Sequence, residues 1–519
     1  MDFPSILNDV LGPVMRGPSS SHTAGSYHIA RIIRDLAEGI PVSALFRFDP
    51  KGSYAHTFRQ QGADNAFAAG LLALEMEDKH FLRALDEASS QGLKIHFEVS
   101  PLRQAIHPNT VDIVLTTQKK EKLHFTAAST GGGRFEITEY QGIPVELRGQ
   151  SYVLLAEIPA KANPCMNNLV SSKTYKSKVF PFGQQKNLFQ VKSPVPFPEE
   201  LLQNIKNIPG KGKVRLSFPV FFPHKGEKTG GIKHNFSQWM RTSSVSDLSL
   251  GERALQYEAN ILGLSPENIL KELEKRYEIM RSSVKNGFDD TKSRMQMISP
   301  FAGKLLLTSQ MGSLPFGGLP TRASARALAA LHTSCSGGVI CAAPTGASAG
   351  VLPGVLVTLE EEMNKNRLII LNSLLAAGAV GLIVAERATF AAEVAGCQVE
   401  IGAAGAMAAA AVVEGFGGTS LQAADAAAVF FQNIMGSVCD LVQGICEIPC
   451  HTRNASAASS AFLCADLIIG GYTNPVPLEE TVDAVFAVGK MLPSELRCTS
   501  RGGLALCPSS LGLSSRKPH

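Results

Sequence analysis

The sequence predicts an α+β protein with three parts: a mixed α/β domain over residues 1–148, a small α/β insert over 149–225 and an all-helical region over 226–519. Three observations predict this division. Strand-like and helix-like segments alternate up to residue 148, whereas the insert is rich in lysine and proline. From residue 248 onward the hydrophobic spacing is almost entirely helical, and alanine and glycine dominate after Pro300.

The first part combines helices with strands. The spacing of Ile29, Ile33 and Leu36 predicts a helix over 25–37. Three consecutive glycines at 131–133 predict a tight backbone passage between two strands. The remaining elements expected here are strands at 42–48, 95–99, 111–116 and 135–137 and helices at 63–74 and 79–88.

The insert and the segment after it are shorter units. Residues 151–158 and 214–220 are strand-like, and the amphipathic segment 198–208 predicts a helix between them. Residues 224–235 are polar and contain glycine, which predicts a linker.

The helical region begins with two charged amphipathic helices at 248–262 and 267–284 and then loses its charge. Residues 327–359 carry no Asp, Glu, Lys or Arg, and neither do residues 368–385. The second run is long enough to cross a membrane, but its neighbours are rich in Ala and Gly, which favours a buried core helix. These residues are the only feature of the sequence that supports a membrane transporter as an alternative.

Composition excludes several classes of protein. The net charge of +4 argues against nucleic acid or an anionic membrane as a partner. The opening residues MDFPSILNDV lack a basic and apolar leader, so we expect a cytoplasmic location. In a reducing compartment the 10 cysteines are not expected to form a disulfide framework. Their concentration after residue 330 indicates buried thiols, a metal site or an iron–sulfur site.

One candidate site is the segment Ser19, Ser20, Ser21, His22 and Thr23, which follows a Gly-Pro turn and precedes a helix. Hydroxyl and backbone N–H groups at a helix N-terminus suit a carboxylate or phosphate. An imidazole adds an acid–base group that titrates near neutral pH. By composition alone, a Ser/Thr-rich helix cap with an exposed histidine fits as well.

The second candidate is the set Cys397, Cys439 and Cys450. Three thiolates from separate segments could hold three irons of a cubane cluster and leave the fourth open as a Lewis acid. Their spacing alone fits zinc or simple packing equally well. A third candidate is the small-residue loop 342–350 around Thr345, where backbone amides could approach a ligand or two helices could pack closely.

Taken in chain order, the motifs resemble those of the iron–sulfur L-serine dehydratases, also called L-serine ammonia-lyases. The matching segments are GPSSSHT at 17–23, HPNT at 107–110, STGGG at 129–133, APTGASAGVLPGVL at 343–356, EVAGCQVEIG at 393–402, CDLVQGICEIPCHTRN at 439–454 and RGGLA at 501–505.

The resemblance implies an N-terminal β-type domain that closes over a helical α-type domain, which carries a [4Fe–4S] cluster on Cys397, Cys439 and Cys450. In such proteins a C-terminal cysteine can cap the open iron. Cys507 is the better match for that role and Cys498 the alternative. The middle part lies where some relatives carry an ACT-type regulatory module. We also expect a homodimer.

The implied reaction converts L-serine into pyruvate and ammonia. His22 would transfer the proton, and the residues expected to orient the amino-acid substrate are Ser19, Ser20, Ser21, Thr23, Asn109 and Thr345. One departure stands out, because Gln61 occupies the position of a family histidine and cannot act as a base. His56 could compensate. The departure keeps two alternatives open: a lyase acting on L-threonine or L-cysteine, and a catalytically silent cluster sensor.

Overall fold

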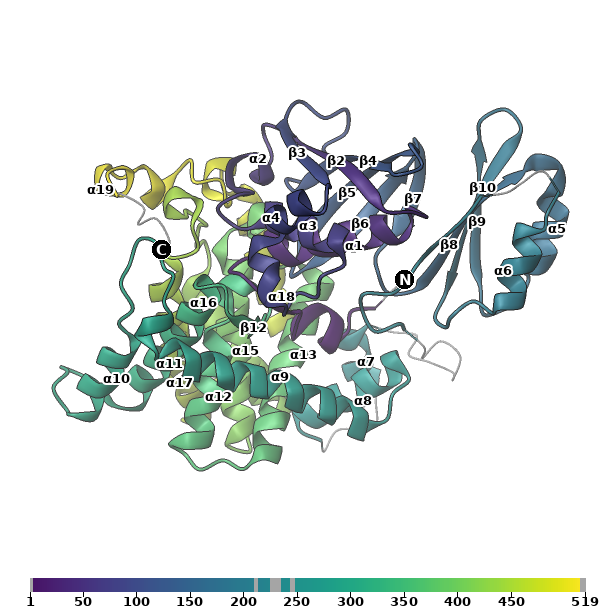
Figure 1. The fold of residues 1–519 in the computed structure, drawn as a ribbon. Helices are drawn as coiled ribbons and strands as arrows, with labels where there is room; N and C mark the ends of the chain where they lie inside the picture. Colours follow the sequence, from purple (N-terminus) through teal and green to yellow (C-terminus); the bar gives the residue numbers. More distant parts are fainter. Residues whose placement is uncertain (1–2, 210–212, 225–234, 243–247, 514–519) are drawn as a thin grey trace.

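The computed structural model describes residues 3–209, 213–224, 235–242 and 248–513. Figure 1 shows a sheet domain packed on a large helical body, with a small separate sheet projecting from one side. This arrangement confirms the predicted α+β class. The predicted linker lies almost wholly outside the described residues.

The sheet domain has six strands in the order β3-β2-β4-β5-β6-β7. β2 and β3 pair in parallel, and the other neighbours are antiparallel. The strands are β2 (Pro41–Phe48), β3 (Lys94–Val99), β4 (Thr110–Thr117), β5 (Lys122–Gly131), β6 (Arg134–Tyr140) and β7 (Ile143–Leu147). The helices are α1 (Gly25–Asp35), α2 (Ser53–Thr57), α3 (Ala63–Leu72), the 3-10 helix η3 (Lys79–Arg83) and α4 (Ala84–Ser90).

Alternating burial explains why this sheet carries helices on one face. In β4, Val111, Ile113 and Leu115 are fully buried, whereas Asp112 between them is half-buried. Asp112 accepts a hydrogen bond at 3.0 Å from Arg47 on the neighbouring strand. The sequence did not predict β5 and β7, because small residues interrupt the alternation in β5 and Pro144 lies in β7.

The projecting module has β8 (Tyr152–Pro159), α5 (Asn163–Leu169), β9 (Lys176–Phe182), β10 (Lys186–Ser193), α6 (Glu199–Lys206) and β11 (Lys213–Ser217). Its antiparallel sheet has the order β11-β8-β10-β9, which is a βαββαβ arrangement of the ferredoxin-like type. The predicted strand at 214–220 ends at Ser217, before Pro219. α5, β9 and β10 were not predicted.

The helical body begins at α7 and follows the sequence prediction closely. Its helices are α7 (Phe236–Thr242), α8 (Leu250–Leu262), α9 (Pro266–Gly287), α10 (Ala302–Gln310), α11 (Gly318–Cys335), α12 (Val351–Glu361), α13 (Arg367–Arg387), α14 (Ala392–Ala395), α15 (Ile401–Gly415), α16 (Ser420–Ile434), α17 (Cys450–Ile469), α18 (Leu478–Met491) and α19 (Pro508–Leu511). Ser249 caps α8 and Thr419 caps α16, each in a reciprocal capping box.

Burial explains the shortage of charge in this body. All residues of α15 are buried, and its neighbour α13 is buried along most of its length. α13 and the helical segment 397–415, which includes α15, are each long and apolar enough to cross a membrane. However, 78% of the apolar stretch in α13 and 100% of that in 397–415 are buried inside the structure. They are therefore packed as buried core helices, as the sequence favoured.

The first residues of the chain belong structurally to the helical body. The π-helix η1 (Ile6–Val10) lies in the helical core, where the buried Glu258 carboxylate accepts the backbone N–H groups of Ile6 and Leu7 at 2.7 and 2.9 Å. The following strand β1 (Val14–Arg16) pairs with β12 (Val339–Cys341). The segment before the serine-rich loop is thus held against the helical body.

Candidate active site

The three predicted cysteines come from separate segments of the helical body. Cys397 begins the 3-10 helix η8 (Cys397–Val399), Cys439 lies in a loop, and Cys450 is the first residue of α17. A fourth thiol joins them from the chain end: Cys439 N–H donates to Leu496 O at 2.8 Å, and Cys498 N–H donates to Cys439 O at 2.9 Å. These backbone bonds fix Cys498 beside Cys439.

The thiols share one electrostatic environment. Cys397, Cys439 and Cys450 are each 3% exposed, and the guanidinium of Arg453 interacts electrostatically with all three. Burial raises the pKa of Cys397 to about 12. A hydrogen bond with Cys498, together with burial, raises that of Cys439, whereas a hydrogen bond from Cys446 lowers the pKa of Cys450.

Within the described ranges, no group of three or more His, Cys, Asp and Glu residues is close enough to hold a single metal ion. A cubane cluster puts each thiolate on a different iron, so its cysteines stand farther apart than the ligands of one ion. Thiolates are the donors that select zinc, copper(I) and iron–sulfur clusters.

The serine-rich loop forms the π-helix η2 (Ser20–Ala24), which runs directly into α1. Ser19 caps it by accepting the backbone N–H of His22 at 3.1 Å. Thr23 donates to the backbone oxygen of Gln61 at 2.8 Å, which joins the loop to the segment after α2. Ser129 on β5 donates to the backbone oxygen of Ser21 at 2.6 Å.

His22 is fully buried, which contradicts the alternative of a helix cap with an exposed histidine. Burial lowers its pKa to about 4, although the carboxylate of Glu393 opposes the shift. Its Nε2 lies 2.9 Å from Thr57 Oγ1, which itself donates to Ser53 O at 2.8 Å. The threonine oxygen therefore accepts the Nε2 proton, and we assign the lone pair of the neutral ring to Nδ1.

Glu393 is the main site residue that the sequence analysis missed. Its Oε1 accepts hydrogen bonds from Ser21 Oγ at 2.5 Å and from Asn109 Nδ2 at 3.1 Å, and it lies 3.4 Å from His22 Nδ1. Burial would raise the pKa of Glu393, but His22 and these donors hold it below its ordinary value. Only its place four residues before Cys397 could have pointed to it.

Three buried polar atoms at this centre have no hydrogen-bond partner within the part of the chain that the structure describes. They are Ser20 Oγ, Asn109 Oδ1 and Glu393 Oε2. Ser20 lies in the serine-rich loop, Glu393 is hydrogen-bonded to Ser21 of that loop, and Asn109 is hydrogen-bonded to Glu393. Unpaired buried groups are unfavourable, so this set is suited to binding a small polar ligand.

Two further predicted segments close around the loop. At Gly346, beside the buried Thr345, a side-chain Cβ would stand 3.0 Å from the backbone of Pro18. Thr345 also hydrogen-bonds the buried carboxyl of Glu400. On the other side, Gly131 has a φ of +100°, and a Cβ there would meet Ala391 N at 2.7 Å. The sheet domain thus reaches the segment that carries Glu393.

α2 connects the two groups of residues. Ser53 Oγ donates to the backbone oxygen of Cys498 at 2.7 Å and lies 3.5 Å from His22 Nε2. Gln61 Nε2 donates to Cys498 Sγ at 3.5 Å. The serine-rich loop and the thiols therefore form one continuous site at the contact between the sheet domain and the helical body.

Two predicted residues lie outside these networks. His56 is half-buried, hydrogen-bonds the backbone of Pro50 and faces Arg501; burial, with that cation, lowers its pKa. Its Nε2 has no partner among the residues that could be described. Cys507 is exposed.

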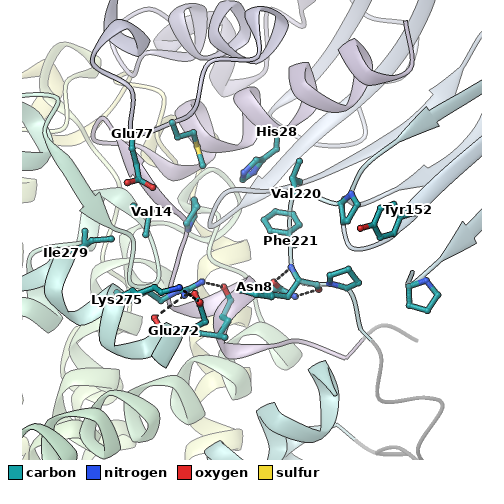
Figure 2. Close-up of a pocket in the computed structure, with 18 of the residues that line it drawn as sticks. Asn8, Val14, His28, Glu77, Tyr152, Val220, Phe221, Glu272, Lys275 and Ile279 are labelled. Atoms are coloured by element: carbon teal, nitrogen blue, oxygen red, sulfur yellow. Dashed lines mark hydrogen bonds and ion pairs between the residues drawn. The ribbon is translucent and has the colours of Figure 1, made fainter. Parts of the chain in front are cut away.

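A cavity of about 1050 Å³ lies elsewhere, between the sheet domain and α9. Figure 2 shows its walls, where His28 and Val14 face the connecting segment with Val220 and Phe221 and, below them, residues of α9 such as Glu272. None of the four thiols described above lines it. This cavity is therefore separate from the thiols.

Comparison with known proteins agrees with this picture. The chain matches the family Serine dehydratase alpha chain over residues 233–505. It is 34% identical over 282 residues to a probable L-serine dehydratase alpha chain of Bacillus subtilis, covering 54% of this chain and 94% of that one. It is 39% identical over 240 residues to the L-serine dehydratase alpha chain of Peptoniphilus asaccharolyticus, covering 46% and 82%.

The beta chain of the same Peptoniphilus enzyme is also similar, with 36% identity over 151 residues, which cover 29% of this chain and 67% of that one. The resemblance seen in the motifs is confirmed. The chain belongs to the serine dehydratase family, and it unites in one polypeptide regions similar to that family's alpha and beta chains.

Proposed function

We propose that this lyase is an iron–sulfur L-serine dehydratase that converts L-serine into pyruvate and ammonia. The observation that carries the proposal is the junction of two groups of residues at one domain contact. One group is a buried set of thiols under the Arg453 cation, and the other is a polar centre around His22 and Glu393. The names of the relatives point to the same substrate.

The donor set fits a [4Fe–4S] cluster held by Cys397, Cys439 and Cys450. All three thiols are buried, interact with one another electrostatically and share the nearby cation, which would offset the negative charge of thiolates. When bound, such a cluster supplies a Lewis acid that polarises the β-hydroxyl of the substrate.

For the fourth position we propose Cys498 in place of Cys507. The support is its hydrogen bond to the Cys439 thiol, its 5% exposure and the amide of Gln61, which donates to its sulfur. Cys507, by contrast, is exposed. Gln61 thereby acts as a positioning residue for this thiol, a role that needs no titrating group.

The unpartnered atoms of the polar centre suit an amino acid. Asn109 Oδ1 and the ionised Glu393 are acceptors that would bind the substrate ammonium group, whereas Ser20 Oγ can donate to a carboxylate. Ser19 and Ser21 hold the loop in shape through the bonds described above, and Thr23 anchors it to the Gln61 backbone. Thr345 precedes Gly346, whose Cα packs against Pro18 before the loop.

Proton transfer is assigned to His22. With a pKa lowered to about 4 it is neutral at pH 7, and its Nδ1 lone pair can accept the substrate Cα proton. Glu393, at 3.4 Å from that nitrogen, stabilises the imidazolium that forms. Loss of the Cα proton and of the β-hydroxyl as water gives 2-aminoacrylate, which hydrolyses to pyruvate and ammonia.

The experiment is anaerobic reconstitution with iron and sulfide, followed by a pyruvate assay on L-serine, L-threonine and L-cysteine. We expect a brown protein that forms pyruvate from L-serine. Full activity in iron-free protein would contradict the proposal. A loaded cluster with no turnover of any of the three amino acids would favour the sensor alternative instead.

We also propose a cytoplasmic homodimer. The similarity to L-serine dehydratase chains supports an intracellular enzyme of amino-acid metabolism. Light scattering of the purified chain measures its mass in solution, and a monomeric mass would contradict the dimer.

A further inference from the structure

Cys446 is a buried thiol that the proposed ligand set does not use. Its Sγ lies 3.5 Å from Cys450 Sγ, and the two residues are 2% and 3% exposed. The chain between them forms a turn that leads into α17, in which His451 N–H donates to Glu447 O at 3.1 Å. That turn brings side chains four residues apart onto one side.

We infer that Cys446 and Cys450 are a modification site: they form a disulfide when the chain carries no cluster, and this bond protects Cys450 from irreversible oxidation. A disulfide joins its sulfur atoms at about 2.05 Å, so the two atoms must approach by about 1.5 Å. Rotation about the side-chain torsions of two neighbouring residues can supply that movement.

The oxidant is hydrogen peroxide. It oxidises the Cys450 thiol to a sulfenic acid with release of one water, and the Cys446 thiol then attacks that sulfur and displaces a second water. Overall, two S–H bonds are lost, one S–S bond forms and one peroxide is reduced to two waters. Without a neighbouring thiol, the sulfenic acid would be oxidised further to sulfinic acid, which thiols do not reduce.

A third thiol nearby, that of Cys335, is engaged in a hydrogen bond to the backbone and not to either sulfur of the pair. Cys335, which is half-buried, donates its thiol hydrogen to the backbone oxygen of Cys446 at 3.0 Å. The inferred pairing of Cys446 with Cys450 rests on the distance of 3.5 Å between their two sulfur atoms. Its consequence for loading, namely that Cys450 must be reduced before it can bind iron, rests on the proposed function.

The direct test maps the bond in full-length, cluster-free protein. The chain is freed of iron with a chelator, treated with hydrogen peroxide, and cleaved after glutamate without reductant. Cleavage after Glu447 separates Cys446 from Cys450, so a disulfide leaves two peptides joined until a thiol reductant is added. We expect this joined pair in the wild type and its loss in Cys446→Ser. Separate peptides in the oxidised wild type would overturn the inference.

The protective role is tested by reloading. After peroxide and reductant, we expect wild type to regain the visible absorbance of untreated, reconstituted protein. Cys446→Ser should regain at most about half of that absorbance, and its Cys450 should carry two or three added oxygen atoms. Cys464→Ser is the matched control, because Cys464 is buried in the same helix.

Equal recovery of Cys446→Ser and wild type would refute protection. If untreated wild type fails to load any cluster, the proposed function fails, while the joined peptides still decide whether the thiols pair.

Discussion

Replacing Glu393 by glutamine tests the proposed mechanism at a single carboxylate. The change keeps the volume of the side chain and an acceptor oxygen but removes the charge 3.4 Å from His22 Nδ1. At that separation, and with an effective dielectric constant of about 20, a carboxylate stabilises an imidazolium by about 5 kcal/mol. Since the glutamine oxygen retains part of this as a dipole, we expect kcat/KM to fall by about 10²- to 10³-fold.

The pH profile supplies a second readout. Burial lowers the pKa of His22 to about 4 and Glu393 opposes that shift, so without the carboxylate the histidine pKa falls further. A base with a lower pKa stays unprotonated to a lower pH. The acid limb of kcat/KM should therefore move to lower pH in Glu393→Gln.

The assay is pyruvate formation by anaerobically reconstituted protein, with cluster absorbance and thermal unfolding recorded for each variant. Glu386→Gln is the control, because Glu386 is a half-buried carboxylate whose hydrogen bonds from Ser237 of α7 lie outside the network of His22. A Glu393→Gln enzyme that loads its cluster and keeps kcat/KM within about three-fold of wild type would refute the role of Glu393.

Four other substitutions test three separate features of the structure. Cys498→Ser should speed the loss of cluster absorbance in air, whereas Cys507→Ser, at an exposed position, should behave as wild type; the reverse order would restore Cys507 as the cap. Arg453→Met should lower the iron retained per chain, because it removes the cation that faces the three thiols, and undiminished iron would show that the charge is dispensable. Glu258→Gln tests a buried carboxyl whose pKa burial raises to about 7 from 4.5. Between those values the folded chain holds a proton that the unfolded chain releases, so the free energy of unfolding should fall as pH rises through this window. Urea unfolding should show that decline in wild type and a flatter profile in the variant, and identical profiles would contradict it.

Hydrophobic periodicity was sufficient to predict an element where one pattern runs through its whole length. The spacing in α1 and the long uncharged run of α13 each specify one helix, and both elements form. Periodicity failed for β5 and β7, whose strands depend on partners already in the sheet. It also could not reveal that η1 packs in the helical core, because that position is set by contacts with Glu258, about 250 residues away.

The sequence predicted those residues of the site that lie in recognisable motifs. Ser21, His22 and Asn109 were expected to act together, and the structure brings them into one network. Glu393 was missed because its partner Ser21 lies 372 positions away, and a single glutamate beside small residues carries no pattern of its own. The link from Gln61 to Cys498 likewise depends on a fold-dependent contact between distant segments.

The central claim is that the thiols beside the His22–Glu393 centre hold a [4Fe–4S] cluster that acts on L-serine. Mössbauer spectroscopy of anaerobically reconstituted, ⁵⁷Fe-labelled protein tests this most directly when spectra are recorded before and after L-serine is added. We expect one cubane cluster per chain and a change at a single iron when the amino acid binds, accompanied by pyruvate formation. A spectrum without such a cluster, or a cluster spectrum that L-serine leaves unchanged, would contradict it.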